Sequence, residues 1–177
     1  MRSSWAVSGP GVRRRQPFRL ETSFWVSAWR ADVAANCLDL FAMIPPKAVE
    51  QEIQENDPLF PAGEFPYATL FRHLRDKMLD PPDPEPDPLN LLGHGERAAI
   101  PFAQHLKVPL LVNEAKAKKY ATNAGLTVIT VPATIVVLYR HGVISNNAAW
   151  RKLELLKGNT AAEIIGDAAA ALSALGA

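Results

Sequence analysis

Two short apolar segments, each followed at once by a helical pattern, constrain the fold of this chain more than any other feature. Residues 108–112 and 127–131 are apolar or β-branched and lack the alternation of a half-exposed strand, so we expect them to be buried strands. Helical patterns follow over residues 115–124, with Gly125 as the stop, and from Pro132 to Gly142. Strands that alternate with helices through short connections predict a parallel α/β sheet with crossover helices.

The N-terminal part repeats this alternation. Residues 18–20 predict a first strand, and Ser23 is placed to cap a helix that carries Phe24, Trp25, Ala28 and Trp29. Residues 42–44 predict a second strand, and a helix follows over residues 48–53.

The middle and the end of the chain add helices. Apolar residues at Ala99, Phe102 and Leu106 predict an amphipathic helix that begins near Glu96, just after a turn in which glycines flank His94. Another helix is expected over residues 147–157. Thr160 and Glu163 then have the spacing of a capping box for an alanine-rich final helix.

Charge is unevenly distributed along the chain. The first 20 residues hold five arginines and no acid, so the rest carries a net charge of −4 although the whole chain is at +1. Residues 1–16 mix Ser, Gly, Pro and Arg, and we expect a disordered basic arm there. The remaining length suits a single domain over residues 17–177.

Cys37 is the only cysteine, which excludes an intramolecular disulfide and a cysteine-rich zinc site and suits a reducing cytosol. No apolar run approaches the length of a membrane span, and the arginine-rich start lacks the apolar core of a signal peptide. We therefore expect a soluble, cytoplasmic protein without a membrane partner.

Four acids stand where predicted elements begin, end or face inward: Glu21 after the first strand, Glu52 on a helix, Glu96 at a helix start and Glu114 after a strand. Ligand sites of parallel sheets form at the carboxyl ends of the strands, where Glu21 and Glu114 would lie. Hard cations such as Mg²⁺ and Mn²⁺ prefer oxygen ligands, so the set predicts a divalent-cation site. Taken singly, Glu21 or Glu52 is more simply a surface acid.

These segments resemble the PIN-domain ribonucleases. The likeness spans residues 20–145 and rests on ETSFWVSAWR, IPPKAVEQEI, GHGERAAIPFAQ and LLVNEAKAKKYATNAGLTVITVPATIVVLYRHGVIS. The last segment, which ends in a glycine, two hydrophobic residues and a serine, is the most specific. It is similar to the subgroup found as toxins of toxin–antitoxin pairs.

The resemblance implies a three-layer α/β/α fold with a central parallel sheet and a metal-dependent endoribonuclease that hydrolyses RNA phosphodiester bonds. By position it assigns metal-binding roles to Glu21, Glu96 and Glu114, and Glu52 completes the catalytic acids. Mg²⁺ or Mn²⁺ would be the cofactor. Residues that orient substrate or water would be Thr22, Ser23 and Asn113. The partners implied are RNA, a cognate antitoxin protein and a second copy of the chain.

At two positions the chain departs from the family pattern. Glu21 and Glu114 stand where the family usually has aspartate, which keeps the charge and adds a methylene group. Because Mg²⁺ demands near-octahedral geometry at short distances, displaced carboxylates favour a more tolerant ion such as Mn²⁺ or Ca²⁺. The alternative interpretation is a PIN-like module that binds RNA or protein with weak or no catalysis.

Overall fold

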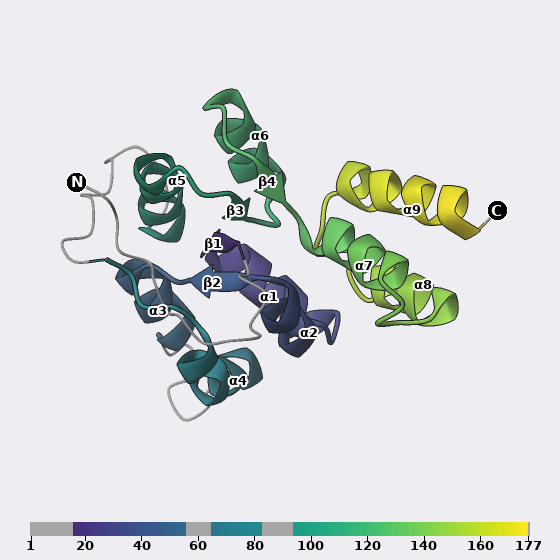
Figure 1. Ribbon diagram of the computed structural model, residues 1–177, viewed down its shortest axis with the longest axis horizontal. Helices are drawn as coiled ribbons and strands as arrows, with labels where there is room; N and C mark the ends of the chain where they lie inside the picture. Colours follow the sequence, from purple (N-terminus) through teal and green to yellow (C-terminus); the bar gives the residue numbers. More distant parts are fainter. Residues whose placement is uncertain (1–15, 56–64, 83–93, 177) are drawn as a thin grey trace, which may run out of the picture.

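A parallel four-stranded sheet lies at the centre of the molecule. The computed structural model describes residues 16–55, 65–82 and 94–176, and Figure 1 shows their arrangement. The strands lie in the order β2–β1–β3–β4, and all pair in parallel. Their bounds are β1 Pro17–Leu20, β2 Ala42–Ile44, β3 Leu110–Leu111 and β4 Val128–Ile129.

Helices cover both faces of the sheet, which gives the three-layer α/β/α architecture expected from the sequence. One face packs on α5 and α6. The larger core on the other side contains buried residues of α1 to α4 and α7 to α9, and within it α8 and α9 pack on α7 and on each other. The helices of the first layer are α5 His94–Leu106 and α6 Ala115–Asn123. Those of the second are α1 Thr22–Arg30, α2 Ala34–Leu40, α3 Lys47–Gln54, α4 Pro66–Leu74 (followed by a 3₁₀ turn, Arg75–Lys77), α7 Val131–Arg140, α8 Asn146–Glu154 and α9 Ala162–Gly176.

Alternation along the strands divides the core between the two layers. Phe18, Leu20 and Leu111 belong to the larger core, beside α1, whereas Leu110 packs with α5 and α6. Arg19 points to the α5 side, is fully buried, and its guanidinium carbon lies 3.1 Å from the centroid of the Phe102 ring. A guanidinium is attracted to the face of an aromatic ring, so this contact stabilises the buried Arg19 side chain.

The predicted order of strands and helices is confirmed, but three local predictions are wrong. Ser23 lies inside α1, whose N-cap is Glu21. Val131 is the first residue of α7 rather than the end of β4, because Thr130 caps that helix by accepting a hydrogen bond from the Ala133 amide at 3.3 Å. The final helix begins at Ala162, so Thr160 lies one residue too early to be its N-cap.

Several sequence predictions fall outside the described residues. They concern residues 1–15 of the expected basic arm and the glycine-flanked turn before residue 94. The side chains of residues 94–98, which include His94 and Glu96, are also outside the description, although the backbone there forms the start of α5.

Candidate functional site

Glu21 joins the end of β1 to the start of α1. Its backbone amide donates to the Leu111 carbonyl at 3.0 Å, which extends the pairing of β1 with β3 by one residue. Its side chain is 5% exposed, and one carboxylate oxygen, Oε2, accepts hydrogen bonds from the Ser23 amide at 3.0 Å and from the Ser23 hydroxyl. The carboxylate is thus buried at a helix N-terminus, where a negative charge is favoured.

Ser23 connects this carboxylate to the neighbouring strand. While its hydroxyl donates to Glu21, the same oxygen accepts from the backbone amides of Asn113 at 2.9 Å and of Glu114 at 3.1 Å. Residues that are about 90 positions apart in the chain therefore meet at one hydroxyl. The carboxyl ends of β1 and β3 are joined there, at the edge of the sheet where parallel folds bind ligands.

Glu52 reaches the same end of the sheet from α3. Its Oε2 atom accepts a hydrogen bond of 2.6 Å from the Thr22 hydroxyl, and both side chains are half-buried. Because Thr22 directly follows Glu21, this contact brings a second acid to the start of α1. Glu50, two residues earlier on α3, instead pairs with Arg75 at 2.7 Å. This agrees with the expectation that Glu52 faces inward.

The side chain of Asn113 lies at the centre of a buried network of hydrogen bonds. Its amide nitrogen donates to the Ser27 hydroxyl at 2.9 Å and to the Thr160 hydroxyl at 2.8 Å, and its amide oxygen accepts from the Val131 backbone at 3.2 Å. The side chain is 3% exposed. Asn113 therefore fixes the backbone on which Glu114 stands by tying it to α1, to α7 and to the segment before α9.

The sequence did not identify two members of this network, Ser27 and Thr160, as residues of the site. Ser27 lies one helical turn after Ser23, on a helix whose neighbouring positions Phe24 and Ala28 are buried. A second serine on the buried side of a helix is a signal that could have indicated a polar contact, because buried hydroxyls need partners. Thr160 offers no comparable signal, since its local spacing also fits a capping box.

The remaining two acids are Glu114 and Glu96. Glu114 lies at the N-cap position of α6, is exposed, and makes no side-chain capping hydrogen bond. Glu96 lies in the first turn of α5, and its side chain is outside the description. Within the described ranges, no three His, Cys, Asp or Glu side chains gather closely enough to hold a metal ion.

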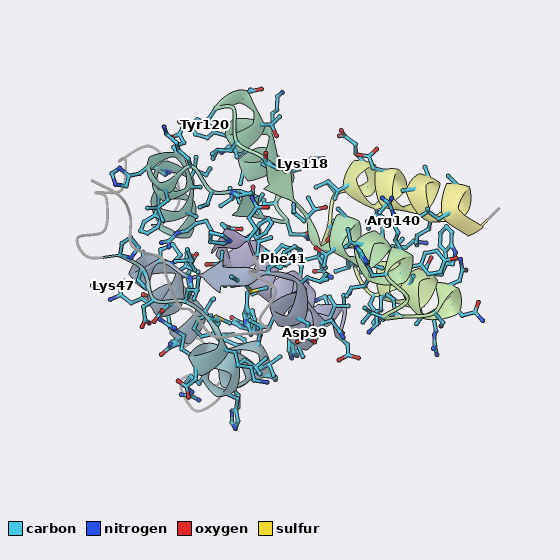
Figure 2. The ribbon with its side chains drawn as sticks, in the orientation of Figure 1. Asp39, Phe41, Lys47, Lys118, Tyr120 and Arg140 are labelled. Carbon is cyan, nitrogen blue, oxygen red and sulfur yellow. The ribbon has the colours of Figure 1, made fainter. Side chains whose placement is uncertain are left out.

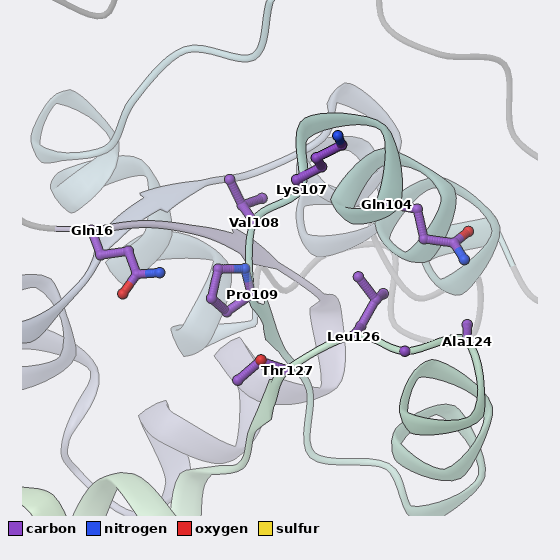
Figure 3. A pocket seen from close by; sticks show the side chains of 9 residues that line it. Gln16, Gln104, Lys107, Val108, Pro109, Ala124, Leu126 and Thr127 are labelled. Atoms are coloured by element: carbon purple, nitrogen blue, oxygen red, sulfur yellow. The ribbon is translucent and has the colours of Figure 1, made fainter.

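A cleft of about 440 Å³ opens at the opposite end of the strands (Figure 3). Its lining includes Gln16, Pro109 and Thr127, which precede β1, β3 and β4, and the side chains of Gln104 and Lys107. Its described lining residues include no carboxylate. This hollow is therefore separate from the group of residues around Ser23, where the acid Glu21 lies.

Cys37 gives no support for thiol chemistry. It is fully buried between apolar neighbours of α2 and the core, and burial raises the pKa of its thiol far above the ordinary value. A thiolate is the reactive form, so this residue is chemically inert in the folded protein.

Comparison with known protein families and with the curated proteins found no match. Among the helices that the structure describes, none combines the length and the apolar character needed to cross a membrane.

Proposed function

We propose that this protein is a metal-dependent endoribonuclease whose active site is the carboxyl end of β1 and β3. The observation that carries the proposal is the Ser23 hydroxyl, which binds the Glu21 carboxylate and also the backbone amides of Asn113 and Glu114. Two acids from separate strands are thereby held at one edge of a parallel sheet, and Glu52 is added through Thr22.

The oxygen ligands that these acids offer suit a hard divalent cation. Glu21, Glu52 and Glu114 offer carboxylate oxygens, the ligands that Mg²⁺ and Mn²⁺ prefer. The described part does not assemble three of them within reach of one ion, and Glu96, the fourth acid, has its side chain outside that part. Glu21, Glu96 and Glu114 would hold the metal. A bound ion would supply an acidified water and neutralise charge on the phosphate.

Hydrogen bonds within the protein orient two of the carboxylates at this site. Ser23 and Thr22 donate to one oxygen each of Glu21 and Glu52, so neither carboxylate rotates freely. Pre-oriented groups lower the entropy cost of reaching the transition state. Glu52, which reaches the start of α1 from α3 through the Thr22 hydroxyl, is the group that we assign to accept the proton of the attacking water.

Cleavage of a fluorescent single-stranded RNA tests the proposal. With Mn²⁺ or Mg²⁺ we expect cleavage that stops in EDTA, and we expect Glu21→Gln and Glu96→Gln to slow it by about 10²-fold or more. The matched control is Glu163→Gln, an exposed acid in the first turn of α9, which should cleave like the wild type. Melting curves of each variant separate lost activity from lost folding.

The outcomes distinguish the alternatives. Metal-supported cleavage that survives in both Glu21→Gln and Glu96→Gln would place the activity elsewhere or in a contaminant. Binding of RNA without any product under either ion would favour the second candidate, a PIN-like binding module. The exposed position of Glu114, whose side chain makes no capping contact, is the feature that favours this second candidate.

We also propose an antitoxin protein and a second copy of the chain as partners. Both follow from the resemblance to toxins of toxin–antitoxin pairs. Light scattering of the purified chain measures its oligomeric state. Inhibition of the RNA cleavage by a protein co-produced with the chain tests for the antitoxin.

A further inference from the structure

We infer that the exposed face of α6 formed by Lys116, Lys119 and Tyr120 binds single-stranded RNA next to the candidate site. The inference rests on the proposed function and extends it to the form of the substrate. Helix α6 begins directly after Glu114, so its residues extend outward from the place where the Ser23 hydroxyl binds the Glu114 amide. Tyr120 lies about 9 Å along the helix axis from Glu114 at the usual rise per residue.

The three side chains share one side of the helix. Positions 116, 119 and 120 are spaced i, i+3 and i+4, and all three residues are exposed, Tyr120 at 42%. Ala117 and Ala121, on the other side, are buried against the sheet and α5. Figure 2 shows Tyr120 and Lys118 on opposite sides of α6.

Within the part of the chain that the structure describes, the two lysines of this face have no acidic partner. Lys118 pairs with Asp167 of α9 at 3.9 Å, whereas among the described residues no ion pair involves Lys116 or Lys119. Lys116 also lies in the first helical turn, which holds no acid, and a cation there is disfavoured by the helix dipole. Two lysines that make no ion pair with the described residues, placed beside Glu21 and Glu114, suit a polyanion that must approach those acids.

The exposed tyrosine favours a single strand over a duplex. Proteins that track single strands combine cations along the backbone with aromatic rings on which unpaired bases stack. In an A-form duplex the bases are stacked on one another, so their faces are not available to Tyr120. The occupant that matches two lysines and one aromatic ring is therefore single-stranded RNA.

Fluorescence anisotropy with a labelled single-stranded RNA and the duplex of the same sequence, both in EDTA, tests the inference without cleavage. Tyr120→Ala should weaken single-strand binding on the order of tenfold and leave duplex binding within twofold, and Tyr120→Phe should bind like the wild type. Lys116→Ala combined with Lys119→Ala should weaken binding on the order of tenfold. It should also make the negative slope of log K against log salt shallower by about 1.4.

Lys118→Ala is the matched control, since it removes the same charge from the same helix on the face that pairs with Asp167. It should change RNA affinity by less than twofold. The inference is overturned if the wild type does not bind RNA, if Lys118→Ala weakens binding as much as the other lysine changes, or if Tyr120→Ala has no effect. Altered RNA binding without any metal-supported cleavage would support this surface and reject the proposed nuclease. Cleavage with unaltered binding would do the reverse.

Discussion

The side chains of Asn113 and Thr160 are joined by a hydrogen bond of 2.8 Å, although 47 positions separate them in the chain. Asn113 follows β3 at the carboxyl edge of the sheet, and Thr160 precedes α9. The bond therefore ties the C-terminal helices to the backbone that carries Glu114. A change at Thr160 is expected to act on the candidate site through Asn113.

Thr160→Val tests this connection. Valine has the shape of threonine but cannot accept a hydrogen bond, so one amide hydrogen of Asn113 loses its partner. We expect a loss of about 1–2 kcal/mol in the free energy of unfolding, measured by urea denaturation. Thr160→Ser keeps the hydroxyl and should lose less than about 0.5 kcal/mol. A loss in Thr160→Ser as large as that in Thr160→Val would show that the methyl group matters as much as the hydroxyl, and an unchanged Thr160→Val would contradict the connection.

Asn113→Ala removes the whole network. Three hydrogen bonds disappear, and the Val131 amide is left buried without its partner. We expect the free energy of unfolding to fall by about 3 kcal/mol or more. Asn123→Ala, an exposed asparagine at the end of α6, is the control and should stay within about 0.5 kcal/mol of the wild type. A loss at Asn113 no larger than at Asn123 would contradict the central role of this side chain.

The fold was largely predictable from the sequence because it is set by local hydrophobic patterns. Residues 42–44 are apolar and end at two prolines, and they form β2 as expected. Gly125 and Gly142 follow α6 and α7 with φ angles of +78° and +70°, the conformation that favours glycine at a helix end. Such signals need only the nearest neighbours in the chain.

The candidate site was predictable only as a set of acids at one edge of the sheet. Ser23 resembles a helix cap locally, but its hydroxyl binds amides at Asn113 and Glu114 that only the fold brings near. Thr160 fits a capping box by spacing, yet its hydroxyl accepts from Asn113. In both cases a long-range partner competes with the local one, and spacing along the chain carries no information about that partner.

Lys152 is expected to stabilise the end of α1. Its side chain, 15% exposed, donates to the carbonyl oxygens of Ala31 at 3.2 Å and Asp32 at 2.7 Å. Lys152→Met keeps the apolar stem and removes these bonds, so we expect a loss of about 1–2 kcal/mol in the free energy of unfolding. Lys157→Met, at a 60% exposed lysine paired with Glu154, should lose at most about 0.5 kcal/mol. Comparable urea midpoints for the two variants would contradict this role.

Cys37 should make stability fall at alkaline pH. Burial raises the pKa of the folded thiol, whereas a thiol in the unfolded chain ionises at about pH 8.5. Above that pH the unfolded state has released a proton that the folded state keeps, so rising pH favours unfolding. Up to about pH 10.5, the free energy of unfolding should fall by about 1.4 kcal/mol per pH unit more in the wild type than in Cys37→Ala. Parallel pH profiles for the two proteins would contradict the raised pKa.

Lys107 and Gly125 occupy equivalent positions after α5 and α6, with φ angles of +53° and +78°. Glycine adopts this conformation without the steric cost that a β-carbon brings. We expect Lys107→Gly to raise the free energy of unfolding by about 0.5–1 kcal/mol, and Gly125→Ala to lower it by about 1 kcal/mol.

Apart from the two chain neighbours of Gly125, none of the described residues has an atom within 4 Å of the place that a β-carbon would occupy, so the loss at that position would come from backbone conformation and not from a clash. Lys107→Ala separates the backbone effect at α5 from loss of the lysine side chain, because alanine keeps the β-carbon. It should show none of the gain seen in Lys107→Gly. Thermal and urea unfolding of the three variants measure these changes, and a gain in Lys107→Ala equal to that in Lys107→Gly would rule out the backbone explanation.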